Sequence, residues 1–344
     1  MTKVSIIGAT GYAGAELVRL LMMHPHAEIV SISSHSFEGS PLSEIYPAFG
    51  QLNAMICDNQ TEAVNAADIV FAALPHGLSE GLAQECFEKG KIFIDLGADF
   101  RFYDEKKYKE WYGLDYKHTE VHNQAVYALP ELFRDKIKGK KIIGNPGCYP
   151  TSAALALAPA IKNNLISSTG IIADSKSGVT GAGRGLTQAT HFPDCNEAFG
   201  PYKVASHRHT PEIEQTLGEL FEEKVTITFV PHLLPVNRGI LTTAYARLEK
   251  DLTEDDIHKI YVDFYKDEYF VRVLPKGLTA NIKTIKCSNF CDISVHLDAR
   301  TNTLITVSAI DNMVKGAAGQ AVQNMNILLG LDEKTGLEYV PPAF

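Results

Sequence analysis

The sequence predicts an α/β protein, with a doubly wound parallel sheet in its first half and an α+β domain in its second. In the first half, short apolar strands alternate with helical segments, which is typical of a parallel sheet covered by helices on both faces. In the second half, the strands are longer and the pattern favours a mostly antiparallel sheet. A length of 344 residues fits about two domains of ordinary size.

The first elements form a nucleotide-binding pattern. An apolar strand over residues 3–7 leads into the turn GATGYAG, then a helix over residues 13–23 and a strand over residues 28–33. This order is typical of dinucleotide binding, because glycines let the backbone approach the pyrophosphate at the helix N-terminus. The residues expected to bind the cofactor in this turn are Gly8, Thr10, Gly11, Tyr12, Ala13 and Gly14.

The end of the second strand indicates which dinucleotide binds. NAD-specific sites usually carry an Asp or Glu there, which binds the ribose 2′-hydroxyl. Here the chain reads SISSHS over residues 31–36, and the next carboxylate is Glu38. Hydroxyls such as those of Ser33 and Ser34, and a histidine, can hydrogen-bond a 2′-phosphate that a carboxylate would repel. We therefore expect NADP(H) rather than NAD(H).

The alternation continues to the middle of the chain. Strands are expected over residues 68–75 and 91–101 with a helix between them, and the charged and aromatic residues that follow to Lys117 suggest a solvated helix and loop. Ligands of such sheets bind at the carboxyl ends of the strands. The residues expected at those ends are Gly8, Pro75, Arg101 and Cys148.

Cys148 lies in the stretch GNPGCYPT, between a short strand over residues 141–143 and an alanine-rich helix expected to reach Ile161. Pro150 suits a first helical turn, where its missing N–H costs nothing. A helix N-terminus favours the thiolate, the nucleophilic form of a cysteine. The alternative is a small buried core cysteine.

Longer strands dominate the second half. A strand enters a second glycine-rich turn over residues 177–185, helices are expected to open at Thr210-Pro211 and at Thr253, and a small-residue-rich helix closes the chain at Gly330. The further strands lie within residues 225–233, 239–249, 269–275, 291–299 and 303–311, the last two joined by a hairpin.

Candidate polar residues concentrate in this half. His207 and His209 flank Arg208 just before the helix that Thr210 is expected to cap, and we expect the pair to belong to a site. Arg184, Arg208 and Arg238 could each bind a phosphate or carboxylate through two hydrogen bonds, or form a surface ion pair instead.

Composition excludes several classes of function. A net charge of −9 and a pI near 5.7 do not favour nucleic-acid binding. No apolar run is long enough to cross a bilayer, and six cysteines without framework spacing suit a reducing compartment, so we expect a cytoplasmic protein. Cys287 and Cys291 lack a second ligand pair, so no metal site is expected.

One reaction uses a thiolate, a histidine, arginines and NADPH together, namely the reduction of an acyl phosphate. The thiolate attacks the carbonyl carbon, phosphate leaves, and hydride reduces the resulting thioester to a hemithioacetal that collapses to an aldehyde. A histidine can carry the proton at neutral pH.

The motifs GATGYAGAELVRLL, DLGADFR, GNPGCYPT, SGVTGAGRG, HRHTPEI and DNMVKGAAGQAVQNMN span the chain. Through them the sequence resembles the N-acetyl-γ-glutamyl-phosphate reductase family of arginine biosynthesis, within the superfamily of aspartate-semialdehyde and glyceraldehyde-3-phosphate dehydrogenases. Ser152 departs slightly, because many members of the family carry Gly or Ala there.

The resemblance implies a Rossmann-type NADP-binding domain (residues 1–148 and 313–344) and an α+β catalytic and oligomerisation domain (149–312), like that of glyceraldehyde-3-phosphate dehydrogenase. It implies NADPH-dependent reduction of N-acetyl-L-glutamyl 5-phosphate by a homodimer or homotetramer. Cys148 would be the nucleophile, and His207 or His209 the acid/base. Substrate would contact Arg101, Tyr202 and Arg208, and the nicotinamide would lie near Ser177, Gly178, Gly181, Gly183 and Asn312.

Several alternatives are weaker. An epimerase or atypical reductase could use Tyr103 and Lys107, but would leave Cys148 without a role. A cysteine hydrolase would leave the nucleotide-binding pattern without a role. An NADP-binding regulator without catalytic activity would leave the predicted nucleophile without a role. The nearest alternatives are the related reductase of aminoadipyl phosphate in lysine biosynthesis and an aspartate-semialdehyde dehydrogenase.

Overall fold

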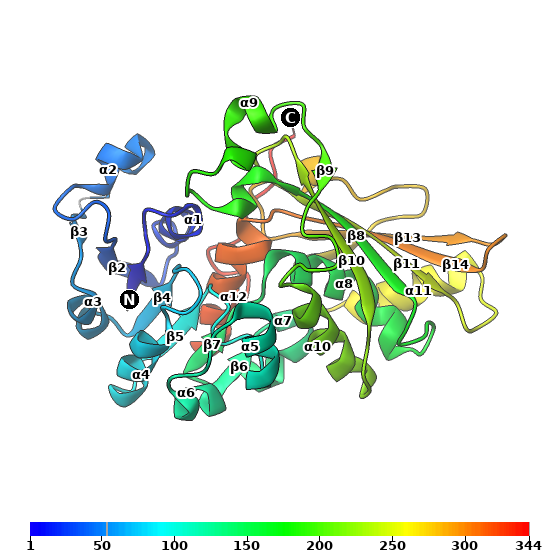
Figure 1. Cartoon of the computed structure of the whole chain (residues 1–344), viewed down its shortest axis with the longest axis horizontal. Coiled ribbons are helices and arrows are strands. Elements are labelled where there is room, and N and C mark those ends of the chain that lie inside the picture. Colours follow the sequence, from blue (N-terminus) through cyan, green and yellow to red (C-terminus); the bar gives the residue numbers. More distant parts are fainter. Residues whose placement is uncertain (53, 344) are drawn as a thin grey trace. The chain divides into compact units, whose positions relative to one another are not determined.

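The computed structural model describes residues 1–52 and 54–343 and divides the chain into two compact units. Unit 1 consists of Met1–Pro146 and Ala317–Glu338, and unit 2 of Gly147–Gly316 and the tail from Tyr339 onward. Figure 1 shows the elements of both, coloured along the sequence. Among the described residues, no helix combines the length and the apolar character needed to cross a membrane.

Unit 1 is built on a seven-stranded sheet in the order β3-β2-β1-β4-β5-β7-β6, and every neighbouring pair is parallel. The predicted doubly wound sheet is therefore confirmed. The order reverses between β1 and β4, which is where ligands of such sheets bind. The strands are β1 (Thr2–Ile7), β2 (Ala27–Ser33), β3 (Ile56–Cys57), β4 (Ile69–Ala72), β5 (Ile92–Asp95), β6 (Ala125–Tyr127) and β7 (Ile142–Gly144).

The helices of unit 1 include one from the end of the chain. Asn324 of α12 donates to the carbonyl of Ala128, and Oδ1 of Asn326 accepts the Nε2–H of His24, at 2.9 Å in both cases. These contacts hold α12 against the first part of the chain. The helices are α1 (Tyr12–Leu21), α2 (Leu42–Ile45), α3 (Gln60–Ala66), α4 (Glu80–Glu88), α5 (Glu105–Tyr112), α6 (Thr119–Gln124), α7 (Pro130–Ile137) and α12 (Gly319–Leu328).

One expectation for unit 1 was wrong, and a second was confirmed only in part. The strand expected over residues 91–101 ends at Asp95, because the Asp95 carboxylate accepts the N–H of Gly97 at 3.0 Å and turns the chain. Arg101 therefore lies beyond the strand end, in an irregular segment. The segment expected to be a solvated helix and loop contains α5, but its Tyr108 is fully buried.

Asp99 organises this irregular segment. Its carboxylate accepts the N–H groups of Gly77 (2.6 Å) and Ser79 (2.9 Å) and the hydroxyl of Tyr108 (2.8 Å). Ser79 also donates its hydroxyl to Asp95 at 2.7 Å. Burial, and then the charge of Asp99, raises the pKa of Asp95. The network fixes the turn between β4 and α4.

Unit 2 contains a second seven-stranded sheet, in the order β12-β13-β14-β11-β8-β10-β9. Four pairings are antiparallel, and β8–β10 and β12–β13 are parallel, so the expected mostly antiparallel sheet is confirmed. The β13–β14 hairpin forms as predicted. The strands are β8 (Ile171–Gly178), β9 (Gly200–Pro201), β10 (Ile227–Leu234), β11 (Ile240–Arg247), β12 (Val271–Val273), β13 (Cys291–Asp298) and β14 (Thr303–Ile310).

The helices of unit 2 are α8 (Cys148–Lys162), α9 (Phe192–Cys195), α10 (Thr210–Phe221) and α11 (Glu254–Tyr265). Helix α11 begins after Thr253, as expected, and its start is a capping box that Asp256 completes. A π-helical turn, Val314–Ala318, leads from unit 2 into α12.

Helix α8 is almost entirely buried against this sheet, and its polar groups are satisfied. The hydroxyl of Ser152 bonds to Ser308 (2.7 Å) and Thr242 (2.9 Å), which also meets Ser175 at 2.8 Å. A serine therefore fits where many relatives were expected to carry Gly or Ala.

Pro159 does not end α8. A proline has no N–H, so the carbonyl four residues earlier, that of Leu155, loses its helical donor. The hydroxyl of Tyr265, from α11, donates to this carbonyl at 2.6 Å. The helix consequently continues to Lys162.

The Asp99 network generates a stability prediction. Asp99→Asn keeps the size of the side chain but replaces an accepting oxygen with N–H groups, so at least one donor loses its partner. We expect the free energy of unfolding to fall by about 2–3 kcal/mol, measured by urea denaturation followed by circular dichroism. Asp115→Asn is the control, since Asp115 is exposed and pairs with Lys109 on the surface, and it should cost less than about 0.5 kcal/mol. Equal losses in the two variants would contradict the role given to Asp99.

Candidate functional site

The turn between β1 and α1 has a shape that requires glycine. Gly8 has a φ of +85°, and a Cβ there would lie 2.4 Å from the carbonyl oxygen of Ala73. A Cβ on Gly14 would lie 2.2 Å from the carbonyl oxygen of Gly8. The N–H groups of Gly8 and Ala9 both donate to the carbonyl of Ser33, which joins the turn to the end of β2. The backbone is thus held close at the carboxyl edge of the sheet.

A cavity of about 660 Å³ opens beside this turn, a size suited to a large part of a dinucleotide. Of the predicted cofactor residues, Gly8, Thr10, Gly11, Ser33, Ser34 and Pro75 line it. Tyr12, Ala13 and Gly14 lie at the start of α1 and are not part of its lining.

The hydroxyls at the end of β2 fit a ligand with oxygen atoms. Ser34 and Thr10 share a hydrogen bond of 2.6 Å. The hydroxyl of Ser33 is buried and has no hydrogen-bond partner among the described residues, although Ser33 lines the cavity. A buried hydroxyl normally has a partner, so this one fits an oxygen of a bound nucleotide.

Sequence reasoning missed the polar residues after β3 that line the cavity, namely Asn59, Gln60, Thr61 and the carboxylate-bearing Asp58. Its carboxylate lies 3.1 Å from Nδ1 of His35, and both residues line the cavity. Asp58 follows β3, which is parallel to β2 with Ser33 opposite Cys57. A strand of only two residues, such as β3, cannot be recognised from its sequence pattern. Recognising it would have placed Asp58 at the carboxyl end of a strand beside β2.

Cys148 is the first residue of α8, after the N-cap Gly147, as the sequence predicts. It is partly exposed, which does not fit a wholly buried core cysteine. Its Cβ would be only 2.7 Å from a Cβ placed on Gly316, so a larger residue at 316 would displace it. Cys148 thus lies at the N-terminus of a 15-residue helix, where the helix dipole favours the thiolate form of a cysteine.

His207 and His209 lie together, with ring centroids 4.9 Å apart, and each meets the ring of Tyr149, the neighbour of Cys148, at 5.5 and 5.8 Å. Nδ1 of His207 accepts the N–H of His209 at 3.1 Å, so the neutral His207 ring carries its proton on Nε2. Burial, followed by the charge of His209, lowers the pKa of His207 to about 3. His207 is therefore neutral at physiological pH.

Two tyrosines complete the surroundings of Cys148. Tyr202 donates its hydroxyl to Tyr149, which donates to the carbonyl of His232, at 3.2 Å in both cases. Burial is the main cause that raises the pKa of Tyr202 to about 12 and that of Tyr149 further, and a charge on Cys148 raises both. Both phenols therefore remain protonated.

Glu212 is a second residue that sequence reasoning missed. It is buried in the first turn of α10, and its carboxylate accepts the N–H of Gly147 at 2.7 Å. It thereby ties the start of α8 to the turn that carries the histidines. The sequence predicted Thr210 as the N-cap of α10. The N-cap is instead His209, because Thr210 is the first residue of the helix. A carboxylate in the first turn of a helix beside two histidines was the available signal.

The second glycine-rich turn is braced by Asn312. Its Oδ1 accepts the N–H of Gly239 at 2.7 Å, and its Nδ2 donates to Thr180 at 2.9 Å. A Cβ on Gly178 would lie 2.7 Å from the carbonyl oxygen of Asn237. Ser177 is buried at the end of β8, and Gly181 and Gly183 are exposed, the latter with a φ of +83°.

The four predicted arginines differ in their surroundings. Arg101, in unit 1, is buried and donates to the carbonyls of Asn145 and Leu96, at 2.8 Å in both cases. Arg238 lies 3.5 Å from both carboxylate oxygens of the buried Asp311. Arg184 and Arg208, in unit 2, are partly exposed. Among the described residues, no group of three or more His, Cys, Asp or Glu could hold a metal ion.

Comparison with known proteins defines the class. Residues 3–140 match the family model described as "Semialdehyde dehydrogenase, NAD binding domain", and residues 148–312 match "Semialdehyde dehydrogenase, dimerisation domain". The solved aspartate semialdehyde dehydrogenase II of Vibrio cholerae has the same fold, with a TM-score of 0.74, 16% identity, and 96% and 98% of the two chains covered. The chain therefore has the domains and the fold of a semialdehyde dehydrogenase.

Curated relatives narrow this class. The N-acetyl-γ-glutamyl-phosphate reductases of Brachyspira hyodysenteriae and Clostridium beijerinckii are 58% and 55% identical to this chain, and each alignment covers 100% of both proteins. The chain belongs to the N-acetyl-γ-glutamyl-phosphate reductase family.

The depressed pKa of His207 predicts a pH dependence of stability. The unfolded chain protonates this histidine near its ordinary pKa of 6.5 and the folded chain only near 3, so unfolding takes up a proton between these values and stability falls as the pH falls. Between about pH 7.5 and about pH 5, the wild type should lose about 2 kcal/mol more than His207→Asn.

Urea denaturation at both pH values measures this difference. The exposed His35→Asn is the control and should keep the wild-type pH dependence. A His207→Asn variant as acid-sensitive as the wild type would refute the assignment of a neutral His207.

Proposed function

We propose that this chain reduces N-acetyl-L-glutamyl 5-phosphate to N-acetyl-L-glutamate 5-semialdehyde with NADPH, releasing phosphate, as a step of arginine biosynthesis. The observation that carries this proposal is a partly exposed cysteine at the N-terminus of α8, whose neighbour Tyr149 meets the rings of two histidines, in a chain of this family. Unit 1 would bind the cofactor, and unit 2 would carry the nucleophile and the oligomer interface.

Cys148 begins the reaction as a thiolate. Its sulfur attacks the carbonyl carbon of the acyl phosphate, the C–O bond to phosphate breaks, and phosphate leaves with the bonding electrons, giving a thioester. The α8 N-terminus stabilises the thiolate before the attack. When bound, NADPH supplies the hydride that reduces this thioester. The hemithioacetal then loses the thiolate and yields the aldehyde.

His209 would move the protons. A histidine with a pKa of about 3 takes up a proton poorly at neutral pH, which removes His207 from this role. His207 would instead position His209, whose backbone N–H it accepts. Because Glu212 joins the start of α8 to the first turn of α10, the helix that carries the nucleophile and the turn that carries His209 keep their relative position.

Tyr202, Arg208, Arg184 and Arg101 would bind the substrate. Tyr202 remains protonated because of its raised pKa, and its oxygen can accept a hydrogen bond from substrate while its O–H donates to Tyr149. Arg208 lies in the turn between the histidines. Guanidinium groups match phosphate and carboxylate oxygens in geometry and charge. Arg238, predicted as a further substrate contact, would act more indirectly, because Asp311 already lies beside it.

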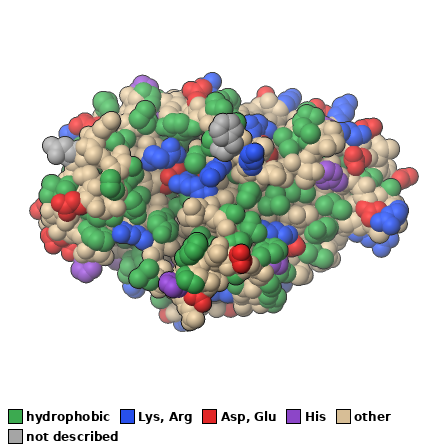
Figure 2. Space-filling view, turned by 90° about the horizontal axis from the view of Figure 1, so that it is seen from above, with side chains coloured by type: hydrophobic (Ala, Val, Ile, Leu, Met, Phe, Trp, Pro, Cys, Tyr) green, Lys and Arg blue, Asp and Glu red, His purple; other side chains and the backbone are tan. Residues whose placement is uncertain are grey.

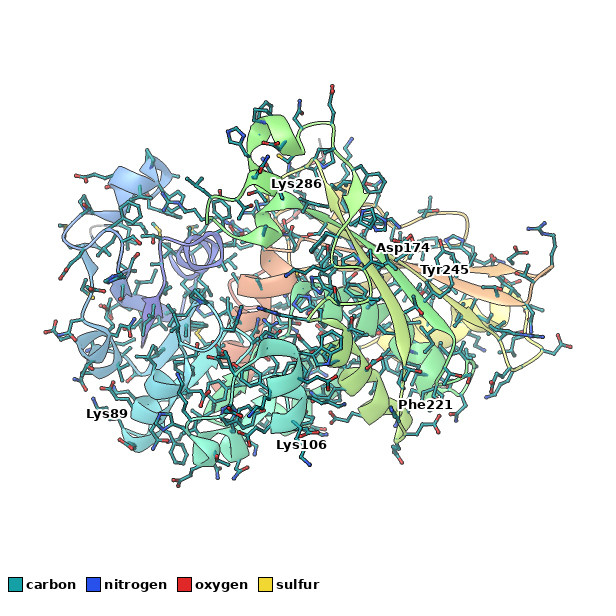
Figure 3. All side chains as sticks on the ribbon, viewed as in Figure 1. Lys89, Lys106, Asp174, Phe221, Tyr245 and Lys286 are labelled. Carbon is teal, nitrogen blue, oxygen red and sulfur yellow. The ribbon has the colours of Figure 1, made fainter. Side chains whose placement is uncertain are left out.

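We further propose a homodimer or homotetramer. The β8 strand alternates between buried residues and residues on its other face, where Ile172 is 43% exposed and Asp174 is half-buried. Tyr245 of β11 pairs with Ile172, and Figure 3 labels both Asp174 and Tyr245. This sheet face in a matched dimerisation domain is a suitable interface for a second copy.

We propose that the protein is located in the cytoplasm, where thiols such as that of Cys148 stay reduced. We expect neither nucleic acid nor membrane as a partner. Figure 2 shows basic and acidic side chains interspersed with apolar ones on the face that it displays.

A reverse-direction assay tests the proposed reaction. N-acetylglutamate semialdehyde, NADP⁺ and phosphate should give NADPH with the wild type, whereas Cys148→Ser should lose activity by about 10⁴-fold or more, because an alcohol is a far weaker nucleophile than a thiolate. NADPH absorbance measures the rate. Aspartate semialdehyde and the aminoadipate homologue serve as competitors, and equal use of either would contradict the substrate assignment.

Single histidine variants test the proton carrier. His209→Asn should lower kcat by about 10²–10³-fold with little change in KM, as expected for an acid/base. His207→Asn should cost about tenfold or less, because it removes only a positioning contact. Steady-state kinetics of both variants decide between the histidines, and the reverse order of losses would transfer the role to His207.

A further inference from the structure

A carboxylate lies where the sequence indicated none. The end of β2 carries only Ser33, Ser34 and His35, which led to the expectation of NADP(H). In the structure, β3 runs parallel to β2 with Cys57 opposite Ser33, so Asp58 leaves the sheet beside Ser34. The neighbouring strand therefore supplies a carboxylate at the edge where NAD-specific proteins carry one on β2 itself.

Asp58 faces the cavity together with the groups expected to bind a 2′-phosphate. Ser33, Ser34, His35 and Asp58 all line it, and the Asp58 carboxylate lies 3.1 Å from Nδ1 of His35. The buried hydroxyl of Ser33, which has no partner among the described residues, is an independent sign that a polar ligand completes this part of the cavity.

We propose that Asp58 determines nucleotide specificity by opposing the 2′-phosphate of NADP(H) and accepting a hydrogen bond from the 2′-hydroxyl of NAD(H). The chain then binds both nucleotides, with a preference for NADP(H) that Asp58 reduces. This inference rests on the proposed function, since it assumes that the cavity holds the adenosine end of the cofactor.

His35 gives the two nucleotides different surroundings. Its side chain is 91% exposed, so its pairing with Asp58 is worth little and can break at small cost. With NADP(H), His35 leaves Asp58 and donates to the phosphate, while Ser33 and Ser34 supply hydroxyls. With NAD(H), the His35–Asp58 pair stays intact, and the remaining lone pairs of the carboxylate accept the ribose hydroxyl.

Charge explains the direction of the discrimination. A carboxylate and a phosphate that share a solvated rim repel each other, which raises the Kd of NADP(H) by about fivefold. Hydrogen bonds from hydroxyls and a histidine to the phosphate can exceed this penalty. The preference for NADP(H) therefore survives, but it is smaller than the same cavity would give without Asp58. Repulsion of one ligand is a common means of setting specificity.

Calorimetric titration of NADP⁺ and NAD⁺ into wild type and variants tests this. In Asp58→Asn, we expect NADP⁺ to bind about fivefold more tightly and NAD⁺ about threefold more weakly. The Kd of NAD⁺ divided by the Kd of NADP⁺ should therefore rise about tenfold or more. His35→Ala should weaken NADP⁺ by about fivefold and leave NAD⁺ within about twofold of the wild type. The control Glu38→Gln removes an exposed carboxylate that does not line the cavity, and should change neither Kd.

The outcomes separate the two proposals, because binding is measured without turnover. If the wild type binds NADP⁺ but Asp58→Asn, folded by circular dichroism, keeps the wild-type Kd ratio, the inference about Asp58 is wrong and the proposed function stands. The same holds if Glu38→Gln shifts the ratio as much as Asp58→Asn. If the wild type binds neither nucleotide, the proposed function fails and the inference fails with it.

Discussion

The start of α8 is the constraint on which unit 2 depends. Cys148 can act as the nucleophile only if three conditions hold. The helix must begin at this residue, the cysteine must be partly open to solvent, and it must keep its position relative to the histidines. Three separate contacts secure this arrangement: Glu212 accepts the N–H of Gly147, Gly316 leaves room for the cysteine Cβ, and Ser152 joins the helix to hydroxyls of the sheet. Each comes from a different part of the chain, so the nucleophile is positioned by the whole unit.

In unit 1, close contacts between backbone atoms position the residues of the cavity. Gly8 and Gly14 bring the turn after β1 against the end of β4 and the start of α1, and Asp99 holds the next turn from the other side. The cavity beside them is lined in part by the glycines of this turn and by the hydroxyl residues Thr10, Ser33 and Ser34. A ligand rich in phosphate oxygens suits such a wall, because N–H groups and hydroxyls are its natural partners.

Much of this could be predicted from the sequence because it depends on local patterns. Apolar strands, glycine turns and the cap at Thr253 are short-range signals, and the position of Cys148 at a helix start follows from neighbouring glycines and prolines. The missed features are all non-local. Asp95 ends its strand through its own side chain, Tyr108 is buried by partners on other segments, and Asp58 reaches the cavity only through the pairing of β2 with a two-residue strand. Glu212 likewise gains its role from Gly147, which is 65 positions away in the chain.

The proline within α8 makes that helix dependent on a distant element. The Leu155 carbonyl, deprived of its usual donor, is satisfied by a phenol 110 residues further along the chain. The helix that presents the sulfur thus cannot complete its hydrogen bonding as a nascent segment leaving the ribosome. It acquires its full set of hydrogen bonds within the protein only when α11 has been made and has docked, after most of unit 2 has been synthesised.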